Sequence, residues 1–239
     1  MNLLPAEQRL VALRARIEAA CADAGRDPAQ ITLVAVSKGV AVALVAGVLD
    51  LGVVDFGENK AQEAAAKAVE MAALRPDSPI RWHFVGQLQR NKASTVARFA
   101  SMVHSVDRQS LVTALDRAAR QRANPLDVLL QLDLDPDPDP TRGGVAAGDL
   151  VGLAEAVLAS ENLTLRGVMA VAPRGADPRD FFDRLVGHSE SLQTMQPSAV
   201  VISAGMSADL EAAILAGATH VRVGTALFGA RKLASEHRT

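Results

Sequence analysis

One lysine closes an apolar segment of the sequence, in the run Ala35, Val36, Ser37 and Lys38. In parallel β/α folds, reactive groups gather where strands end and the following loops begin. Partial desolvation at such a place disfavours the ammonium form of lysine and leaves a neutral amine that can condense with an aldehyde. Lys38 is therefore a candidate for imine formation, and the alternative is a lysine whose side chain extends into solvent.

Two glycine-containing turns late in the sequence could bind an anion. The first contains Gly205 and Ser207, a serine suited to capping the next helix, and the second contains Gly224 and Thr225. Free backbone N–H groups bind anions, and many barrels hold a phosphate between the loops that follow strands seven and eight. The two turns therefore predict a phosphate site, with ordinary turns and caps as the alternative.

Arg222 lies between Val221 and Val223 in the last apolar segment. Charged residues are rare within buried strands unless they are paired. We therefore expect Arg222 either to meet a partner inside the fold or to point outward to solvent.

Polar residues also follow the second and third apolar segments. Asn59 and His83 are candidates for contact with the ring of a bound ligand, whereas Glu58 and Glu63 are expected to be capping and surface groups. Neither cluster has the spacing of metal ligands, and no serine, histidine and aspartate set stands out. The sequence therefore predicts no metal site and no catalytic triad.

These residues are positioned by eight apolar segments that alternate with longer amphipathic segments, as in parallel β/α units. The expected strands span residues 31–36, 53–57, 80–85, 102–106, 126–134, 165–171, 199–203 and 220–224. The expected helices span residues 40–51, 58–74, 89–100, 108–122, 146–160, 178–194 and 208–217, after an opening helix over 5–24. The pattern predicts one α/β domain over residues 1–239, a (β/α)₈ TIM barrel with an extra N-terminal helix.

The composition limits the class of partner. Hydrophobic residues make up 49% of the 239 residues, enough for a sizeable core, and 25 basic residues stand against 27 acidic ones. The chain therefore has no net basic charge to attract nucleic acid, and no run reaches the roughly 20 apolar residues of a membrane span. No secretory signal is recognised, and the one cysteine, Cys21, cannot form a disulfide within the chain. We expect a cytoplasmic protein that binds a small molecule, and neither nucleic acid nor a membrane.

Residues 135–140 alternate aspartate and proline, which excludes both a helix and a paired strand. We expect an extended, solvated loop there. Its carboxylates could bind calcium, although the ligand spacing of a calcium loop is missing.

Taken together, these segments resemble a known family over nearly the whole chain. The family is that of the pyridoxal phosphate homeostasis proteins, which are of the alanine racemase N-terminal-domain type. The matching stretches are AVSK (35–38), FGENKAQE (56–63), WHFVGQLQRNK (82–92), GVMAV (167–171), GMSADLEAAILAG (205–217) and VRVGTALFGAR (221–231).

The resemblance implies a TIM barrel that holds pyridoxal 5′-phosphate as a Schiff base on Lys38. It also implies an arginine facing the pyridine nitrogen, which here is Arg222. A guanidinium keeps its proton, so the ring nitrogen stays unprotonated and the ring becomes a weak electron sink. The other residues that the resemblance assigns to the cofactor are Ser207, Gly224 and Thr225 at the phosphate, Ser203 more weakly, and Asn59 and His83 nearby.

Members of this family bind the cofactor and influence its cellular supply without established turnover, so the resemblance implies no catalytic residue. It also implies delivery of the cofactor to pyridoxal phosphate-dependent apo-enzymes. A monomer is expected, because the β domain that builds the racemase dimer has no counterpart here. The sequence departs from the family at Asp133, where asparagine is usual, and in the loop to Gly144, which lacks the common lysine.

Two alternatives remain. A racemase-like enzyme would need a second acid on the other face of the ring, and the chain contains no tyrosine for that role, although His83 could substitute. An aldolase that forms a lysine imine with a sugar phosphate would also combine a barrel, a lysine and a phosphate site.

Overall fold

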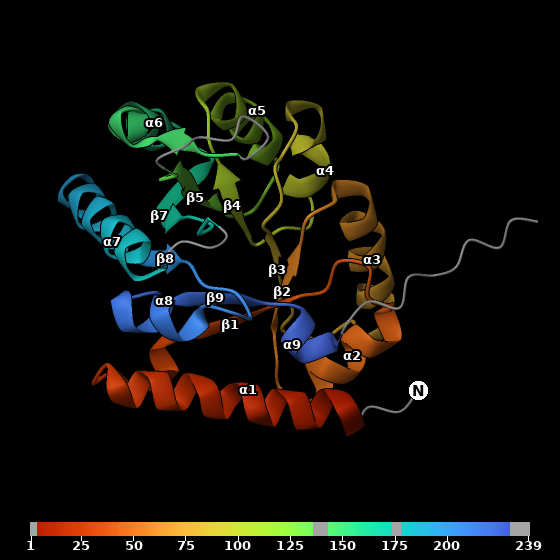
Figure 1. Ribbon diagram of the computed structural model, residues 1–239. Coiled ribbons are helices and arrows are strands. Elements are labelled where there is room, and N and C mark those ends of the chain that lie inside the picture. The colour runs from red at the N-terminus through yellow and green to blue at the C-terminus, as the bar shows by residue number, and fades with distance from the viewer. Residues whose placement is uncertain (1–3, 136–142, 174–177, 230–239) are drawn as a thin grey trace, which may run out of the picture.

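The computed structural model describes residues 4–135, 143–173 and 178–229, with strands at the centre and helices around them (Figure 1). The strands are β1 (Thr32–Val36), β2 (Asp55–Glu58), β3 (Arg81–Phe84), β4 (Met102–Val106), β5 (Leu126–Asp133), β6 (Val145–Ala146), β7 (Leu163–Met169), β8 (Val201–Ser203) and β9 (His220–Val223). The α-helices are α1 (Leu4–Asp23), α2 (Val42–Asp50), α3 (Ala61–Leu74), α4 (Ala93–Ala97), α5 (Gln109–Ala119), α6 (Leu150–Leu158), α7 (Pro178–Met195), α8 (Leu210–Ala216) and α9 (Thr225–Phe228). Short 3-10 turns are η1 (Pro28–Gln30), η2 (Arg90–Lys92) and η3 (Ala147–Asp149).

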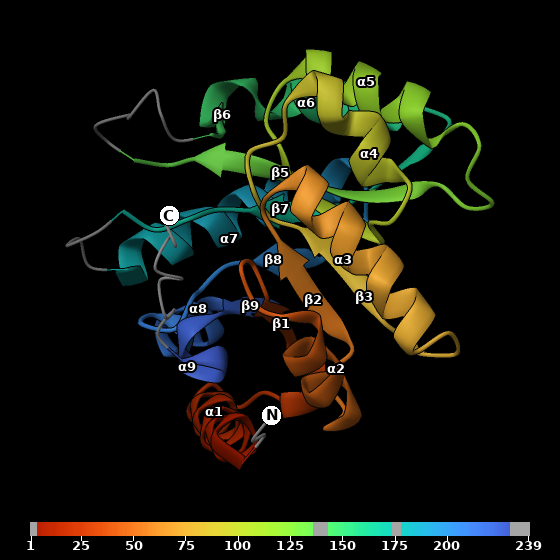
Figure 2. The same cartoon turned by 90° about the vertical axis from the view of Figure 1, so that its right-hand side faces the viewer.

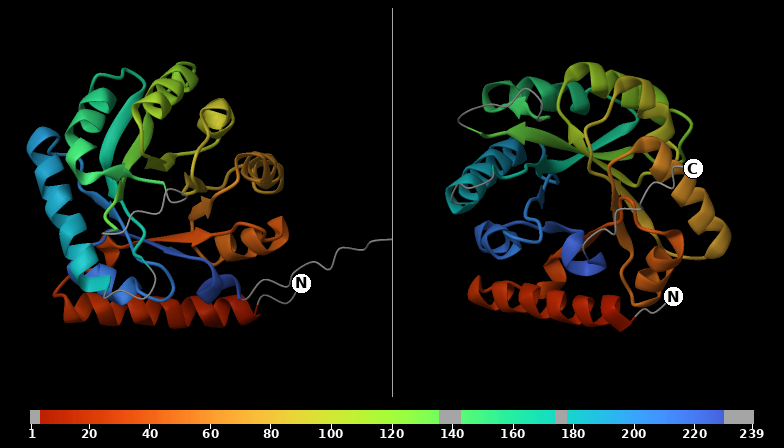
Figure 3. Two further views of the ribbon diagram at one scale, coloured as in Figure 1. Left: turned by 45° about the horizontal axis from the view of Figure 1, so that its top comes forward. Right: turned by 45° about the vertical axis from the view of Figure 1, so that its right-hand side comes forward.

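Eight of the described strands close into a parallel barrel. Neighbouring strands follow the order β4, β3, β2, β1, β9, β8, β7 and β5, and the pairing of β4 with β5 closes the ring. The two-residue strand β6 extends the sheet beside β5. Figure 3 shows the helices as an outer layer around the strands from two directions. The predicted (β/α)₈ TIM barrel is therefore confirmed.

The strands are apolar because both of their faces are covered. In β5, the consecutive residues Val128, Leu129 and Leu130 are all 0% exposed. Successive side chains of a strand point to opposite faces, so one face packs inside the barrel and the other packs against helices. Apolar burial on both faces is the main source of stability for such a strand.

Helix α1 is the predicted extra N-terminal helix. Leu10, Leu13 and Ile17 lie at helical spacing on one face and are buried. The helix packs along α8 and α9 (Figures 1 and 2), and Arg16 Nε lies 2.6 Å from Glu211 Oε1 on α8. This helix therefore covers the part of the outer layer where the last helices of the barrel are short.

All eight predicted strands are present, but three short elements, η1, β6 and α9, were not predicted. Helix α9 has four residues, too few to produce a helical repeat in the sequence. Strand β6 depends on Gly144, whose φ is 148° and where a Cβ would lie 2.5 Å from the Asp133 backbone nitrogen. The predicted helix over 89–100 is divided into η2 and α4.

Three other expectations can be compared with the structure. Cys21 is a free, fully buried residue of α1. Residues 136–140 of the aspartate and proline segment lie outside the described residues. Among the described helices, none is both long and apolar enough to cross a membrane.

Candidate functional site

Lys38 lies just beyond the carboxyl end of β1, where the chain turns. Gly39 has a φ of 69°, and the Val40 N–H donates to the Ser37 carbonyl at 3.0 Å, so residues 37–40 form a tight turn. The Lys38 side chain is partly buried and makes no hydrogen bond or ion pair with any described residue. Its amine is therefore available to a ligand at this end of the barrel.

The loop after β9 lies beside this turn, because β9 and β1 are neighbouring parallel strands. Gly224 comes so close that a Cβ there would lie 3.3 Å from the Val36 carbonyl oxygen. Parallel strands end at the same end of a barrel. Lys38, Gly224 and Thr225 therefore lie at one mouth.

The loops after β8 and β9 also meet each other. The Ser207 hydroxyl oxygen lies 3.4 Å from Thr225 Oγ1 and 3.4 Å from the Ala226 backbone nitrogen. The prediction that Ser207 caps the next helix is wrong, because α8 begins at Leu210 and its N-cap residue is Asp209. The serine hydroxyl instead joins the two loops that were predicted to hold a phosphate.

Arg222 is 5% exposed and points into the barrel. One of its terminal nitrogens donates to the carbonyl and to the hydroxyl oxygen of Ser203, both at 2.7 Å, and the other donates to the Ala170 carbonyl at 2.9 Å. Of the two alternatives for this residue, the internal partner is the one observed. Burial lowers the pKa of Arg222 to about 10, so the guanidinium keeps its charge at neutral pH.

A chain of hydrogen bonds connects Arg222 to the opposite end of the barrel. Beyond Arg222, the Ser203 hydroxyl lies 2.9 Å from His104 Nδ1. His104 Nε2 lies 2.8 Å from His83 Nδ1, and His83 Nε2 lies 2.8 Å from Asp55 Oδ1. The chain therefore crosses the interior from β9 and β8 through β4 and β3 to β2.

The two end residues of this series of hydrogen bonds, Arg222 and Asp55, fix the direction of donation. A guanidinium can only donate a hydrogen bond, and a carboxylate can only accept one. With both histidines neutral, Arg222 donates to Ser203, Ser203 to His104, His104 to His83, and His83 to Asp55. Each donor in this series of hydrogen bonds then points toward the Asp55 carboxylate.

The interior disfavours further positive charge. Burial lowers the pKa of His104 well below its usual value, and electrostatic interactions with His83, His220 and Arg222 lower it further. Burial also lowers the pKa of His220 to about 4, and its ring centroid lies 6.1 Å from that of His83. Despite this gathering of imidazoles, no set of three histidine, cysteine or acidic residues in the described chain is placed to hold a metal ion.

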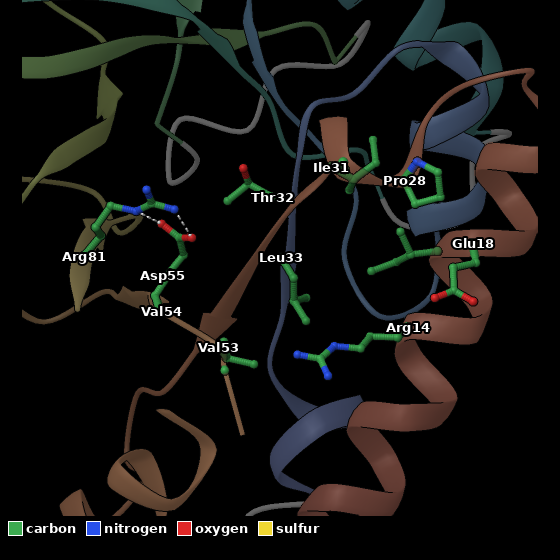
Figure 4. A pocket seen from close by; sticks show the side chains of 13 residues that line it. Arg14, Glu18, Pro28, Ile31, Thr32, Leu33, Val53, Val54, Asp55 and Arg81 are labelled. Atoms are coloured by element: carbon green, nitrogen blue, oxygen red, sulfur yellow. Dashed lines mark hydrogen bonds and ion pairs between the residues drawn. The ribbon is translucent and has the colours of Figure 1, made fainter. Parts of the chain in front are cut away.

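Asp55 begins β2 and pairs with Arg81, as Figure 4 shows; Arg81 Nη2 lies 2.6 Å from Asp55 Oδ2. Burial raises the pKa of Asp55, but hydrogen bonds from His83 and Arg81 outweigh it and bring the value to about 2. The pair borders a cavity of about 380 Å³ that also contains Thr32, the first residue of β1. This cavity therefore lies at the end of the barrel away from Lys38.

Asn59 follows β2, at the same end of the barrel as Lys38. Its Oδ1 atom is buried and has no hydrogen-bond partner among the described residues. Gly86 lies against it, since a Cβ there would come 2.4 Å from the Asn59 carbonyl oxygen. A buried acceptor of this kind normally finds a partner, so Asn59 is able to bind a ligand or a water molecule.

The prediction that Glu58 is a capping or surface group is wrong. Glu58 is 0% exposed, and its Oε1 lies 2.6 Å from the Nζ of Lys67, which is itself 5% exposed. Glu63 is partly exposed, but its Oε1 accepts a hydrogen bond from the Gly39 N–H at 2.5 Å. Because Glu58 Oε1 also accepts a hydrogen bond from the Ser37 hydroxyl, both glutamates contact the turn that carries Lys38.

The structure places the residues predicted to bind the cofactor in two groups. Their contacts with a ligand stay predictions. Those at the mouth are Lys38, Asn59, Ser207, Gly224 and Thr225, and those in the interior chain are His83, Ser203 and Arg222. Sequence reasoning missed His104, although a histidine inside the apolar segment 102–106 is the same kind of signal as Arg222. It also missed Lys67, which gave no signal because a lysine in an alanine-rich helix is normally exposed.

The chain is similar to known proteins over nearly all of its length. The profile of the family described as alanine racemase, N-terminal domain, matches residues 9–232. A pyridoxal phosphate homeostasis protein of Mycobacterium bovis is 42% identical over 241 residues, which cover 95% of this chain and 93% of the relative. The solved structure of PipY from Synechococcus elongatus PCC7942 with PLP bound is 32% identical, with a TM-score of 0.81 and coverage of 94% of this chain and 100% of that one.

Alanine racemase of Corynebacterium glutamicum shares the fold. Its structure has a TM-score of 0.66 at 16% identity, and the alignment covers 96% of this chain but 63% of the racemase. The profile match spans nearly all of the present chain, and the homeostasis protein matches over a similar extent. The chain therefore belongs to the alanine racemase N-terminal domain family and is a homologue of the pyridoxal phosphate homeostasis proteins.

Proposed function

We propose that this chain binds pyridoxal 5′-phosphate and takes part in the cellular supply of that cofactor, as a binding protein without catalytic turnover. The observation that carries the proposal is the Lys38 amine at the same barrel mouth as the Ser207 and Thr225 hydroxyls. The names of the relatives support it, since one is a pyridoxal phosphate homeostasis protein and the PipY structure contains PLP.

The side chains present match the chemistry of this cofactor. Its aldehyde requires an amine, its phosphate requires O–H and N–H donors, and its pyridine nitrogen accepts a hydrogen bond. Lys38 offers the amine, and Ser207 and Thr225 offer hydroxyls next to the N–H groups of the first turn of α9. Arg222 offers a buried, fixed donor within the barrel.

We propose that the linkage is a Schiff base on Lys38. In its formation, Lys38 Nζ bonds to the aldehyde carbon, and the aldehyde oxygen leaves as water. When bound, the cofactor supplies a ring that can withdraw electrons from an attached amine. Arg222 keeps its own proton, so it would leave a ring nitrogen placed beside it unprotonated and would weaken that withdrawal. This arrangement suits holding and delivering the cofactor.

A racemase-like activity is the second candidate, and the geometry favours it less. Two-sided proton transfer needs an acid–base group opposite the lysine. The chain contains no tyrosine, and His83, the possible substitute, is engaged at both ring nitrogens by His104 and Asp55.

We further propose that the protein acts as a cytoplasmic monomer and passes the cofactor to pyridoxal phosphate-dependent apo-enzymes.

Replacement of the proposed linking residue tests the function directly. Purified protein mixed with pyridoxal phosphate is expected to turn yellow, and Lys38→Ala is expected to lose that absorbance because it removes the amine that forms the imine. Borohydride reduction followed by peptide mass analysis locates the attachment. Lys60→Ala removes a lysine from the same mouth and serves as the control. A colourless wild type, or label on a lysine other than Lys38, contradicts the proposal.

A further inference from the structure

Lys67 is a lysine buried within α3, with 5% of its side chain exposed. Its Nζ donates to Glu58 Oε1 and to the Ser37 carbonyl, both at 2.6 Å. Lysine is almost never buried unless it is paired, and removing the two charges from water costs free energy that their attraction offsets only in part. Two apolar side chains in place of both Lys67 and Glu58 would therefore serve the core at least as well. Stability alone does not explain this ion pair.

The ion pair holds the residue before Lys38. Glu58 Oε1 also accepts a hydrogen bond from the Ser37 hydroxyl at 2.7 Å. Ser37 is thus fixed through its side chain by Glu58 and through its carbonyl by Lys67.

The residue after Lys38 is held by the same group of charges. The Gly39 N–H donates to Glu63 Oε1 at 2.5 Å, and that atom lies 3.6 Å from Lys67 Nζ. Both neighbours of Lys38 are therefore tied to one cluster, which consists of Glu58, Glu63 and Lys67. Lys38 itself has no partner among the described residues, so its position depends on these flanking contacts.

We propose that Glu58, Glu63 and Lys67 are positioning residues that place the Lys38 amine for reaction with the aldehyde of pyridoxal phosphate. This inference rests on the proposed function. The reaction joins Lys38 Nζ to the aldehyde carbon and releases water, and its rate depends on the amine approaching that carbon from above or below the plane of the carbonyl group. A misplacement of about 1 Å can slow such a step by about a hundred-fold. The cluster prevents that misplacement by fixing the backbone on both sides of the lysine.

The test compares Lys67→Met and Glu63→Gln with Glu70→Gln, a substitution at an exposed position of the same helix. On mixing with pyridoxal phosphate, Lys67→Met is expected to form the imine between about ten- and a hundred-fold more slowly than wild type. Lys67→Arg is expected to recover part of the rate, because it keeps the charge. Affinity for pyridoxine 5′-phosphate, which has no aldehyde, is expected to stay near the wild-type value because the phosphate and ring contacts are intact.

A second measurement needs no cofactor. Amide hydrogen exchange at Gly39 is expected to become at least about ten-fold faster in Glu63→Gln and Lys67→Met, because a hydrogen bond to a charged acceptor is weakened or released. Glu63 is partly exposed, so Glu63→Gln keeps the test valid if Lys67→Met does not fold. Wild-type rates of both imine formation and Gly39 exchange in folded variants overturn the inference. A wild type that forms no imine contradicts the proposed function instead, and the exchange result still decides whether the cluster holds the turn.

Discussion

Arg222 carries a buried positive charge that no neighbouring carboxylate within the described residues neutralises by direct contact. It is held instead by the carbonyls of Ser203 and Ala170 and by the Ser203 hydroxyl. The nearest carboxylate along the hydrogen-bond chain is Asp55, beyond His104 and His83. The charge of Arg222 is therefore fixed in position inside the barrel.

Removal of the Ser203 hydroxyl, which links Arg222 to His104, is expected to lower both stability and cofactor affinity. Ser203→Ala takes away the partner of His104 Nδ1 and one acceptor of Arg222, and it leaves a buried polar nitrogen without a hydrogen bond. We expect the free energy of unfolding to fall by about 1–3 kcal/mol and the affinity for pyridoxal phosphate to fall several-fold. Urea unfolding and a spectroscopic titration measure the two effects.

The control for that substitution is Ser191→Ala, on the exposed part of α7, where the hydroxyl bonds only to a carbonyl of its own helix. Its free energy of unfolding is expected to stay within about 0.5 kcal/mol of wild type. Equal stability and affinity in Ser203→Ala and the control would show that the Ser203 hydroxyl does not hold Arg222 in place.

At the scale of elements, β7 and β8 depend on one glycine. Gly167 has a φ of 148°, and a Cβ there would lie 1.9 Å from the Val201 carbonyl oxygen of β8. Gly167↔Val201 is also a pair in the ladder between the two strands, so a side chain at 167 has to push them apart. β8 carries Ser203, which holds Arg222, and leads to the loop of Ser207.

Gly167→Ala is therefore expected to lower the free energy of unfolding by more than about 3 kcal/mol, through strain and loss of strand pairing. Gly152→Ala is the matched control, because no atom lies within 4 Å of a Cβ at that helical position in α6. The control is expected to stabilise the protein by about 0.5–1 kcal/mol. Chemical denaturation of both variants measures the difference, and equal stabilities would contradict the close approach at Gly167.

The elements also show how much the sequence alone can predict. The eight strands and the end of the barrel that carries Lys38 follow from apolar segments and from the rule for parallel barrels. Glu58 and Lys67 were not assigned to the interior because each taken alone has the character of a surface residue. Their burial depends on a contact between β2 and α3 that brings opposite charges together, and no periodicity within either segment encodes that contact.

For the whole molecule, the buried histidines make stability depend on pH. The pKa of His220 is lowered by burial to about 4, so the folded barrel does not take up the proton that the unfolded chain binds below about pH 6.5. Stability is thus complete above that pH and falls as the pH drops toward 4. His220 alone accounts for about 3 kcal/mol of this loss.

Urea unfolding between about pH 7 and pH 4 measures the effect. His220→Gln is expected to show a shallower loss, whereas His188→Gln, on α7, is expected to follow wild type. At lower pH a second loss of stability is expected from Asp55, whose pKa in the folded protein is about 2. The Asp55 carboxylate stabilises the fold fully at a pH above the usual pKa of an aspartate, and this contribution is lost as the pH falls and the carboxylate is protonated. Parallel profiles for wild type and His220→Gln would exclude His220 as the source.

The one-way order of donors inside the barrel has a further consequence. Neither His83 nor His104 can exchange its protonated nitrogen alone, because each would then confront a neighbour donor to donor or acceptor to acceptor. At one end of this row the Asp55 carboxylate is neutralised by Arg81, whereas at the other end the Arg222 guanidinium contacts only carbonyl and hydroxyl oxygens among the described residues. The uncompensated charge of the barrel interior is therefore the positive one at Arg222, which attracts an anionic guest.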